Sequence, residues 1–399
     1  MIVYWVWLSL VPHVPMPQKL NLLRCFGDAE GVYHADERSY YNVRGITEKM
    51  VQSLNGKSLE EAEKILQQCA EKSIGVIAYS DSAYPKRLRN IEEPPLVLYY
   101  KGHLPNWQAL LPIGIVGTRH ASATGLQNAH KMGYEMAACG ALVISGGAEG
   151  IDTFALEGAL RAGKRVVAVL GFGADIVYPA KNKDLFQRIE KQGCLITEYI
   201  PGTPPHSWNF PQRNRIISGL SAGLLVVEAP ARSGALNTAR HAMDQGRDVF
   251  VVPGNIGQES CAGSNDLLRD RAMVALCGWD VVREYESLYP QTVHQVTAQV
   301  PAPAERPEPK TAERTKKKPI DNEDKSHYSV LNDEKLQLTG EEKQILSCLT
   351  SQPRPVDEVL AQLEIPSGKV LSLLTMLALK GLVQNHPGKC ISLGNGHQK

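Results

Sequence analysis

From residue 112 onward, the hydrophobic positions gather into short unbroken runs separated by longer segments of mixed polarity. Unbroken runs rich in valine, isoleucine and leucine are typical of strands that are covered on both faces. Strands that alternate with helix-length segments predict an α/β fold with a doubly wound, mainly parallel sheet, here an extended Rossmann-like domain. The expected strands are 113–116, 141–144, 166–170, 194–197, 224–227 and 249–252, with helices at 122–139, 151–162 and 182–192.

The chain before this region has a helical pattern. Apolar residues recur at helical spacing from Leu20 to Phe26 and from Leu59 to Cys69. The apolar first ten residues lack a basic leader and are too short to span a bilayer, so we expect them to pack into a helical core. Two short strands, 74–79 and 96–100, are expected on either side of a proline-rich loop.

The C-terminal region divides into a linker and a small domain. Five prolines between Pro301 and Pro319, a run of three lysines and few apolar residues predict a disordered linker. Thr339 and Glu342 then form a capping box. Helices are expected at 341–349, 356–363 and 367–379, followed by a hairpin at 382–393 that turns at Pro387-Gly388, which together resemble a winged helix.

These patterns divide the chain into four segments. They are a helical N-terminal module (1–75), the Rossmann-like domain (76–286), the disordered linker (287–338) and the winged-helix-like domain (339–394).

Composition narrows the possible functions. The chain has 399 residues, a formal net charge of +1 and 43% hydrophobic residues, which is typical of a soluble globular protein. A nearly neutral chain does not coat DNA uniformly, so any contact with nucleic acid requires a local patch. The eight cysteines form no C-x-x-C pair and lie near no histidine cluster, so we expect reduced thiols, no metal and a cytoplasmic location.

Glycines, hydroxyl groups and basic side chains follow the ends of the predicted strands. Because these ends meet at one edge of a parallel sheet, we expect the turns to converge there and to bind a phosphate-bearing ligand through backbone N–H groups. Glycine also serves in ordinary tight turns, and Asp152 and Asp175 could simply cap helices. The turns are 117–119, 145–152, 171–175, 228–235 and 253–255.

Residues 208–215, which read WNFPQRNR, form the strongest candidate for a nucleic-acid contact. We expect a proline-flanked loop here, and no Asp or Glu occurs between Tyr199 and Leu220, which predicts a local positive surface. Guanidinium groups bind phosphates as forks, and flat rings stack on unpaired bases. Trp208 and Phe210 could equally be plugs of the core, and Arg119 could be the partner of a surface ion pair.

Several enzyme classes lack their motifs in this chain. The sequence contains no G-x-x-x-x-G-K-[ST], no G-x-G-x-x-G after the first strand of the sheet and no G-x-S-x-G. It also contains no cluster of acids for a two-metal nuclease and no His/Cys spacing for zinc. We therefore expect no catalytic residues and no cofactor.

Read in order, these turns resemble the DNA-processing protein A (Smf) family over nearly the whole chain. The residues that carry the resemblance are Gly117-Thr118-Arg119, Ser145 to Ala148 with Gly150-Ile151-Asp152, Gly171 to Asp175 with Tyr178-Pro179 and Asn182, Phe210 to Gly219, Ser233 to Leu236 with Thr238-Ala239, and Pro253-Gly254-Asn255 with Gly263 and Asn265. The resemblance implies that the N-terminal module (1–75) is similar to SAM or helix-hairpin-helix domains. It also implies a non-enzymatic homodimer that binds single-stranded DNA during natural transformation, protects it and loads the RecA recombinase.

The same resemblance implies the residues that contact DNA. They are Gly117, Thr118, Arg119, Ser145, Gly146, Gly147, Ala148, Phe210, Arg213, Asn214 and Arg215, together with Lys181 or Lys183. The choice between the two lysines stays open, because Ala180 stands directly after Tyr-Pro, where many family members have lysine.

Two further departures concern the flanking domains. His13 to Pro17 replace the glycine-rich hairpin of a DNA-binding helix-hairpin-helix relative, so we expect no DNA contact there. The last long helix carries only Lys369 and Lys380, while Val370, Leu371, Leu374 and Leu377 are expected in the core. This favours a contact with a partner protein over recognition of a DNA groove.

Two other functions remain possible at this point. One is a nucleotide phosphoribohydrolase of the cytokinin-activating LOG kind, although the stretch from Pro230 to Thr238 lacks that family's glutamate. The other is an architectural partner of RecA with a vestigial phosphate pocket.

Overall fold

The computed structural model describes residues 1–296 and, with gaps at 351, 353, 364, 366, 381 and 387–389, residues 339–393. Most of the predicted linker and the predicted turn at Pro387-Gly388 therefore lie outside the described residues. The chain forms two compact units, 1–308 and 309–399, which are described separately.

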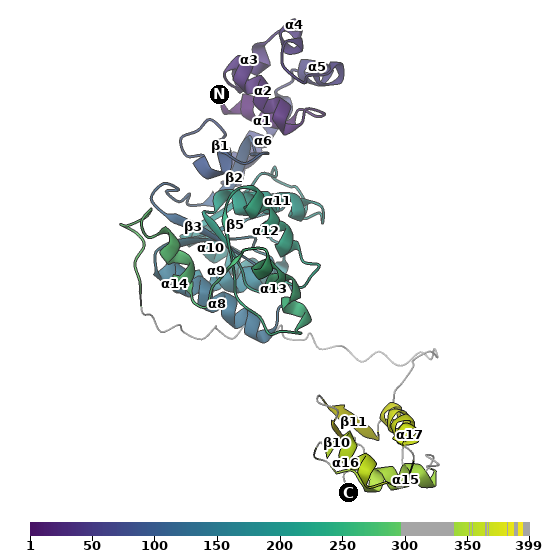
Figure 1. Ribbon diagram of the computed structural model, residues 1–399. Coiled ribbons are helices and arrows are strands. Elements are labelled where there is room, and N and C mark those ends of the chain that lie inside the picture. The colour runs from purple at the N-terminus through teal and green to yellow at the C-terminus, as the bar shows by residue number, and fades with distance from the viewer. Residues whose placement is uncertain are drawn as a thin grey trace, which may run out of the picture. The chain divides into compact units, whose positions relative to one another are not determined.

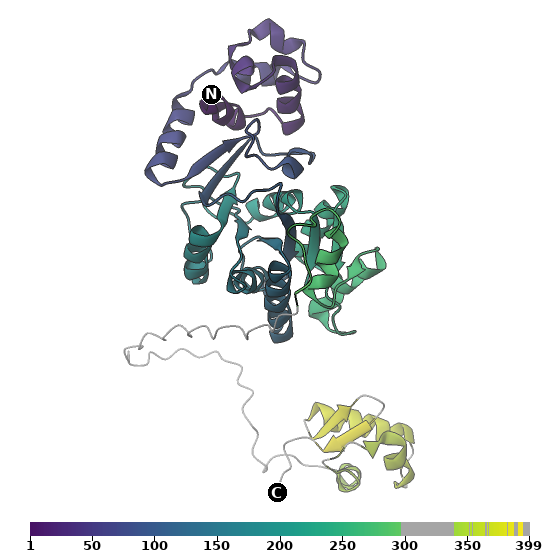
Figure 2. The same cartoon turned by 90° about the vertical axis from the view of Figure 1, so that its left-hand side faces the viewer.

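The first unit is built on a large sheet with helices around it (Figures 1 and 2). The sheet has nine strands in the order β1-β2-β6-β5-β4-β3-β7-β8-β9. In this order, every neighbouring pair from β6 to β9 is parallel, while the β1–β2 and β2–β6 pairs are antiparallel. The predicted doubly wound, mainly parallel sheet is therefore confirmed. The strands are β1 (Gly75–Ala78), β2 (Val97–Gly102), β3 (Leu111–Val116), β4 (Ala141–Ser145), β5 (Val166–Val169), β6 (Cys194–Thr197), β7 (Gly223–Val226), β8 (Asp248–Val251) and β9 (Met273–Val274).

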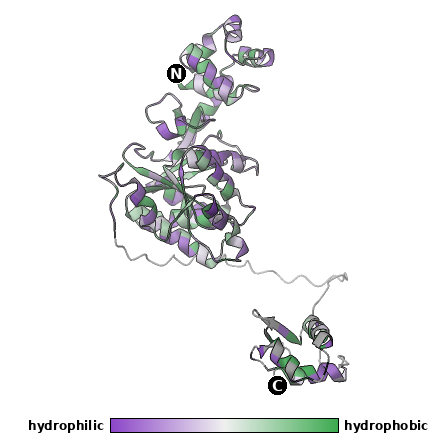
Figure 3. Cartoon of the chain, in the orientation of Figure 1, coloured by the Kyte–Doolittle hydropathy of each residue, from purple (hydrophilic) through white to green (hydrophobic). Residues whose placement is uncertain are grey.

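Helices cover both faces of this sheet, which explains the unbroken apolar runs. Alternate residues of β4 enter opposite cores, with Val143 on one face and Ile144 on the other. One face packs against α8 (Ala123–Ala138), α9 (Ile151–Arg161), α10 (Lys183–Gln192) and α14 (Gly278–Val282). The other packs against α7 (Lys86–Arg89), α11 (Asn209–Leu220), α12 (Gly234–Asp244) and α13 (Ala262–Arg269). Figure 3 shows hydrophobic positions on the central strands and hydrophilic positions on the helices outside them.

Six helices form the N-terminal module and share a core with β1 and β2. The sequence pattern indicated helices in this region but not their number. Trp5, Trp7 and Leu8 of the first helix are buried there beside Val97 and Tyr99 of β2. The helices are α1 (Ile2–Leu10), α2 (Met16–Phe26), α3 (Ala29–His34), α4 (Glu37–Tyr41), α5 (Glu48–Asn55) and α6 (Glu60–Glu71). Among the described residues, no helix combines the length and apolarity needed to cross a membrane.

The ordered chain continues past residue 287, where the sequence predicts the start of the linker. Val293 is only 3% exposed and packs against the main core, and the His294 N–H donates to the Cys139 carbonyl at 3.2 Å. The start of the predicted linker therefore needs correction, because the segment up to residue 296 covers the sheet's helical layer.

The described part of the second unit contains three helices and a three-stranded sheet of order β10-β12-β11. Its elements are α15 (Gly340–Ser347), β10 (Arg354–Pro355), α16 (Val356–Ala361), α17 (Ser367–Leu379), β11 (Val383–His386) and β12 (Cys390–Leu393). The capping box of Thr339 and Glu342 is present, and Val370, Leu374 and Leu377 lie in the core as predicted. The side chain of Leu371 lies outside the described part.

Candidate nucleic-acid interface

A hollow of about 420 Å³ opens at the carboxyl edge of the sheet, where the strand order reverses. Strand β3 has β4 on one side and β7 on the other, so the connections after β3 and β7 leave in opposite directions, as at the ligand sites of many open α/β sheets. The turns after β3, β4 and β7 meet α11 and α12 there. The residues that line the hollow include Gly117, Thr118, Arg119, His120, Ala148, Asp152, Ser207, Phe210, Arg213, Asn214, Arg232, Ser233, Gly234 and Thr238.

Arg119 is an exposed cation that lines this hollow. Its guanidinium carbon lies 4.8 Å from the centre of the Phe210 ring, a cation–π contact that orients the side chain while its N–H groups remain accessible. Within residues 1–296, Arg119 forms no ion pair with a carboxylate. Arg119 is therefore both charged and accessible, as the predicted interaction with an anion requires.

The glycine turn after β4 lies beside Arg119 and needs small residues. A second hollow of about 200 Å³ is lined by Arg119, Gly146, Gly147, Ala148, Tyr178 and Phe210, among others. Gly147 has a φ of +66°, which favours glycine. A Cβ atom on Gly146 would lie 2.6 Å from the Asp152 carboxylate and 2.7 Å from the Arg213 guanidinium. Glycine at 146 therefore lets this buried pair pack directly under the turn.

Residues 209–215 form the first half of helix α11, so the expectation of a loop is wrong. Pro211 is the third helical residue, where its missing N–H costs little because the first N–H groups of a helix have no intrahelical partner. The helix has a physical consequence for its two arginines. Arg213 and Arg215 are two positions apart and therefore point to different sides of α11.

Arg213 faces the sheet and is buried. Its guanidinium donates to the Gly146 carbonyl at 2.7 Å and to the Val169 carbonyl, and it lies near the buried carboxylate of Asp152. Burial lowers the pKa of Arg213 to about 10, against the opposing effect of Asp152, and burial raises the pKa of Asp152. Arg213 lines the hollow, but its donors hold the ends of β4 and β5 together.

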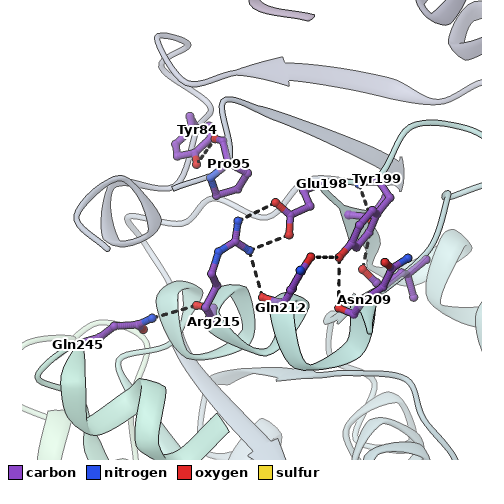
Figure 4. Close-up of polar contacts among 10 residues, drawn as sticks. Tyr84, Pro95, Glu198, Tyr199, Asn209, Gln212, Arg215 and Gln245 are labelled. Carbon is purple, nitrogen blue, oxygen red and sulfur yellow. Dashed lines mark hydrogen bonds and ion pairs between the residues drawn. The ribbon is translucent and has the colours of Figure 1, made fainter. Parts of the chain in front are cut away.

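Arg215 does not line this hollow, contrary to the expectation that it contacts DNA together with Arg119. Figure 4 shows its guanidinium turned toward Glu198 instead. Arg215 forms a bidentate pair with Glu198 in which both N–O distances are 2.7 Å, and its side chain is only 13% exposed. Burial opposes the charge, yet the Glu198 carboxylate raises the pKa of Arg215. The arginine fork that the sequence assigns to phosphate is occupied by the protein's own carboxylate.

The remaining predicted residues divide into internal and accessible groups. The Ser145 hydroxyl is buried and donates to the Ile115 carbonyl at 2.6 Å, and Asn214 bonds to the Gly234 carbonyl of α12 at 3.2 Å. Lys181 and Lys183 are both exposed, and Lys181 lies 3.7 Å from Glu149 in a solvent-exposed pair. The structure leaves both lysines accessible and does not choose between them.

The N-terminus of α8 is already occupied by a carboxylate. Glu228 is 3% exposed and accepts hydrogen bonds from the Ser122 N–H at 2.9 Å and the Ser122 hydroxyl at 2.6 Å. In dinucleotide-binding folds, the helix after the first strand of the parallel sheet offers this position to a pyrophosphate. Here the Glu228 carboxylate already accepts from the N–H and hydroxyl groups of Ser122 at the start of this helix, which disfavours a bound nucleotide at this position.

Several residues at the site were not among the predicted DNA contacts. The larger hollow is also lined by His120, Ser207 and Arg232. Sequence reasoning could have selected them only if the order of the strands, and thus the place where it reverses, had been known. Trp208 is 62% exposed and stacks on His206 with ring centres 4.3 Å apart and planes 10° from parallel. The sequence left open whether Trp208 fills the core or offers a stacking surface, and this exposure shows that it does not fill the core. Among the described residues, no group of three His, Cys, Asp or Glu side chains could hold a metal ion.

Comparisons with known proteins agree with this geometry. The profile of the family described as DNA recombination-mediator protein A matches residues 75–286, and that of the DprA winged helix domain matches residues 332–389. Protein Smf of Synechocystis is 31% identical over 399 residues, covering 96% of this chain and 97% of its own. DNA processing protein DprA of Streptococcus pneumoniae is 39% identical over 208 residues, or 52% of this chain and 72% of its own.

A solved structure extends the comparison to three dimensions. The crystal structure of DNA processing protein A from Streptococcus pneumoniae superimposes with a TM-score of 0.64 at 30% sequence identity, covering 71% of this chain and 98% of that protein. The matching profiles, the full-length relative and this fold lead to one conclusion. The chain belongs to the DNA recombination-mediator protein A family, whose members are also named DprA and Smf.

Proposed function

We propose that this protein binds single-stranded DNA without sequence preference in the hollow at the carboxyl edge of the sheet. The observation that carries the proposal is Arg119, an exposed guanidinium held over the Phe210 ring beside the glycine turn 146–148. An arginine fork and backbone N–H groups bind phosphates of any sequence. Lys181 or Lys183 adds a further exposed charge at the same edge.

Exposed aromatic rings favour a single strand over a duplex. Trp208, 62% exposed, is the residue that precedes α11, and Phe210 and Tyr178 lie near the mouth with their ring centres 5.9 Å apart. Unpaired bases can stack on such rings, whereas the bases of a duplex are stacked on each other.

The test compares single- and double-stranded DNA of equal length by fluorescence anisotropy over a range of salt concentrations. We expect tighter binding of the single strand and a fall of log K with log salt of about 0.7 per phosphate contact. Equal affinity for both forms, or binding that salt does not weaken, would contradict the proposal.

The proposal extends to recombination. As a mediator, the protein would protect the strand and deliver it to a RecA-type recombinase in the cytoplasm during transformation. The expected result is faster assembly of RecA on single-stranded DNA that is already covered by a competing single-strand binding protein. Assembly at an unchanged rate would leave only the DNA-binding part of the proposal.

A homodimer is supported by an apolar edge of the sheet. Val274 and Leu276, in and after the edge strand β9, are 52% and 67% exposed, and Ile256 is fully exposed. Exposed apolar side chains on an edge strand favour association with another chain. Replacement of Val274 by Arg should shift the protein from dimer to monomer in analytical ultracentrifugation, whereas a dimer that survives V274R would rule out this edge.

We also propose that the protein is not an enzyme. Glu228 occupies the helix N-terminus that a nucleotide would use, which argues against the phosphoribohydrolase alternative. Incubation with AMP should release no adenine.

A further inference from the structure

A separate hollow of about 260 Å³ lies between the N-terminal helices and the loop after β1. It is lined by Trp5 of α1, Leu20, Leu23 and Arg24 of α2, Gly27, Tyr79, Ser80 and Arg89. None of these residues lines the DNA-binding hollow proposed above. The two sites can therefore be tested independently.

The walls of this hollow combine apolar and aromatic surface. The rings of Trp5 and Tyr79 lie 6.2 Å apart with an angle of 32° between their planes, and Leu20 and Leu23 complete the apolar side. The volume is slightly below the roughly 300 Å³ at which protein pockets begin to hold drug-sized ligands. The space suits one flat ring system with a single attached group.

Two arginines provide positive charge at this hollow. Arg24 is exposed, and its guanidinium donates to the side-chain oxygen of Asn21 at 3.1 Å. The Arg89 guanidinium lies 5.2 Å from the Tyr79 ring centre, donates to the Asp81 carbonyl at 3.1 Å and keeps a buried Nε–H without a hydrogen-bond partner. Within residues 1–296, neither arginine forms an ion pair with a carboxylate, unlike Arg215.

We propose that this hollow binds one nucleotide unit, with the base against Trp5, Tyr79 and Leu20 and the phosphate on Arg24 and Arg89. Flat apolar walls accept a base, and unpaired guanidinium groups accept a phosphate. The unit is either a free mononucleotide or one nucleotide of a DNA strand. In the second case the inference rests on the proposed function, because the same strand would also occupy the carboxyl-edge hollow.

The test measures binding of deoxyadenosine monophosphate (dAMP) to the full chain by equilibrium dialysis. Arg24→Glu should weaken binding about tenfold or more, because it removes a charge-assisted hydrogen bond and adds repulsion. Arg24 is exposed, and within residues 1–296 its side chain bonds to Asn21 alone, so the variant should fold. Arg89→Gln provides a second test from the opposite wall. The matched control is Arg269→Glu on α13, an exposed arginine outside both hollows.

Arg119→Ala separates this site from the DNA-binding hollow. We expect the variant to bind dAMP as the parent does, while its affinity for a dT oligomer falls. Displacement of dAMP by the dT oligomer in this variant would identify a nucleotide of a strand as the occupant, and displacement by free nucleotides alone would identify a mononucleotide. The inference is overturned if dAMP does not bind, if Arg24→Glu and Arg89→Gln leave binding unchanged, or if Arg119→Ala abolishes it. An oligomer affinity that is unchanged in Arg119→Ala would instead contradict the proposed function.

Discussion

The turn after β3 and the first half of α11 both carry arginines and both line the same hollow, yet their arginines have different surroundings. Arg119 lies on an exposed turn and is held by a ring, so its N–H groups remain available. Arg213 and Arg215 lie on a helix whose two sides both face protein, where they meet Asp152 and Glu198. The backbone that carries an arginine, more than the residue itself, decides whether it can bind a ligand or must support the fold.

The prediction with the largest expected effect concerns Arg213, the buried arginine of this comparison. Arg213→Ala should lower the free energy of unfolding by about 3–5 kcal/mol, because it leaves the Asp152 carboxylate buried without its partner. Urea denaturation measures this change. The double variant Arg213→Ala, Asp152→Asn should recover part of the loss, and Arg232→Ala, an exposed arginine at the same hollow, should leave stability unchanged. A loss below about 1 kcal/mol would show that Arg213 is not structural.

The substitution Arg119→Ala tests whether the exposed arginine of this comparison binds DNA. The affinity for a dT oligomer should fall roughly 10- to 100-fold, because a charge-assisted hydrogen bond to a phosphate is lost, while stability stays the same. Fluorescence anisotropy at fixed salt gives the affinity. Arg119→Lys should lose less, since it keeps the charge but not the fork. If Arg119→Ala binds as the parent does, the proposed site is wrong.

Arg215→Ala sharpens the contrast between the two arginines of α11. We expect the free energy of unfolding to fall by about 2 kcal/mol, because Glu198 is then left partly buried without its bidentate partner. The folded variant should bind a dT oligomer within about twofold of the parent, since Arg215 does not line the hollow. A large loss of affinity with unchanged stability would show that Arg215 contacts DNA after all, as the sequence predicts.

Trp208→Ala asks whether stacking extends the site beyond the phosphate contact. Removal of an exposed platform should weaken oligomer binding about fivefold, the lower end of the range for one stacked base. Trp208→Phe should keep most of the affinity. Binding of the oligomer should also quench the tryptophan fluorescence of the parent. Quenching that persists unchanged in Trp208→Phe would assign the signal to another tryptophan.

The sequence predicts the sheet far better than it predicts the site. Strand positions follow from local runs such as 141–144, because burial on both faces demands apolar residues at every position. The roles of Arg213 and Arg215 depend instead on Asp152 and Glu198, which come from other elements, so the absence of acids between 199 and 220 says nothing about pairing. Pro211 suggested a loop because proline breaks a helix interior, although it is tolerated in a first turn.

The smallest effect concerns an ion pair between the N-terminal module and the Rossmann-like domain. Asp175 accepts from Lys72 Nζ at 2.6 Å and from the Gly202 N–H at 2.9 Å. Burial alone would raise the pKa of Asp175, but these hydrogen bonds outweigh it and lower the pKa below its usual 3.8. The contact therefore stabilises the native state above that value and loses its contribution as the pH falls through the lower folded-state pKa.

Asp175→Asn should accordingly reduce the free energy of unfolding at neutral pH by less than about 1 kcal/mol, because Lys72 is 43% exposed and solvent screens the pair. In acid, below about pH 4, the parent should lose this advantage and the two proteins should converge in stability. Asp184→Asn is the matched control, since Asp184 is 82% exposed and its ion-pair partner among residues 1–296 is Arg188 on the same helix. A difference between parent and Asp175→Asn that stays constant from neutral to acidic pH would mean that the carboxylate's charge contributes nothing and that Asp175 acts through packing alone.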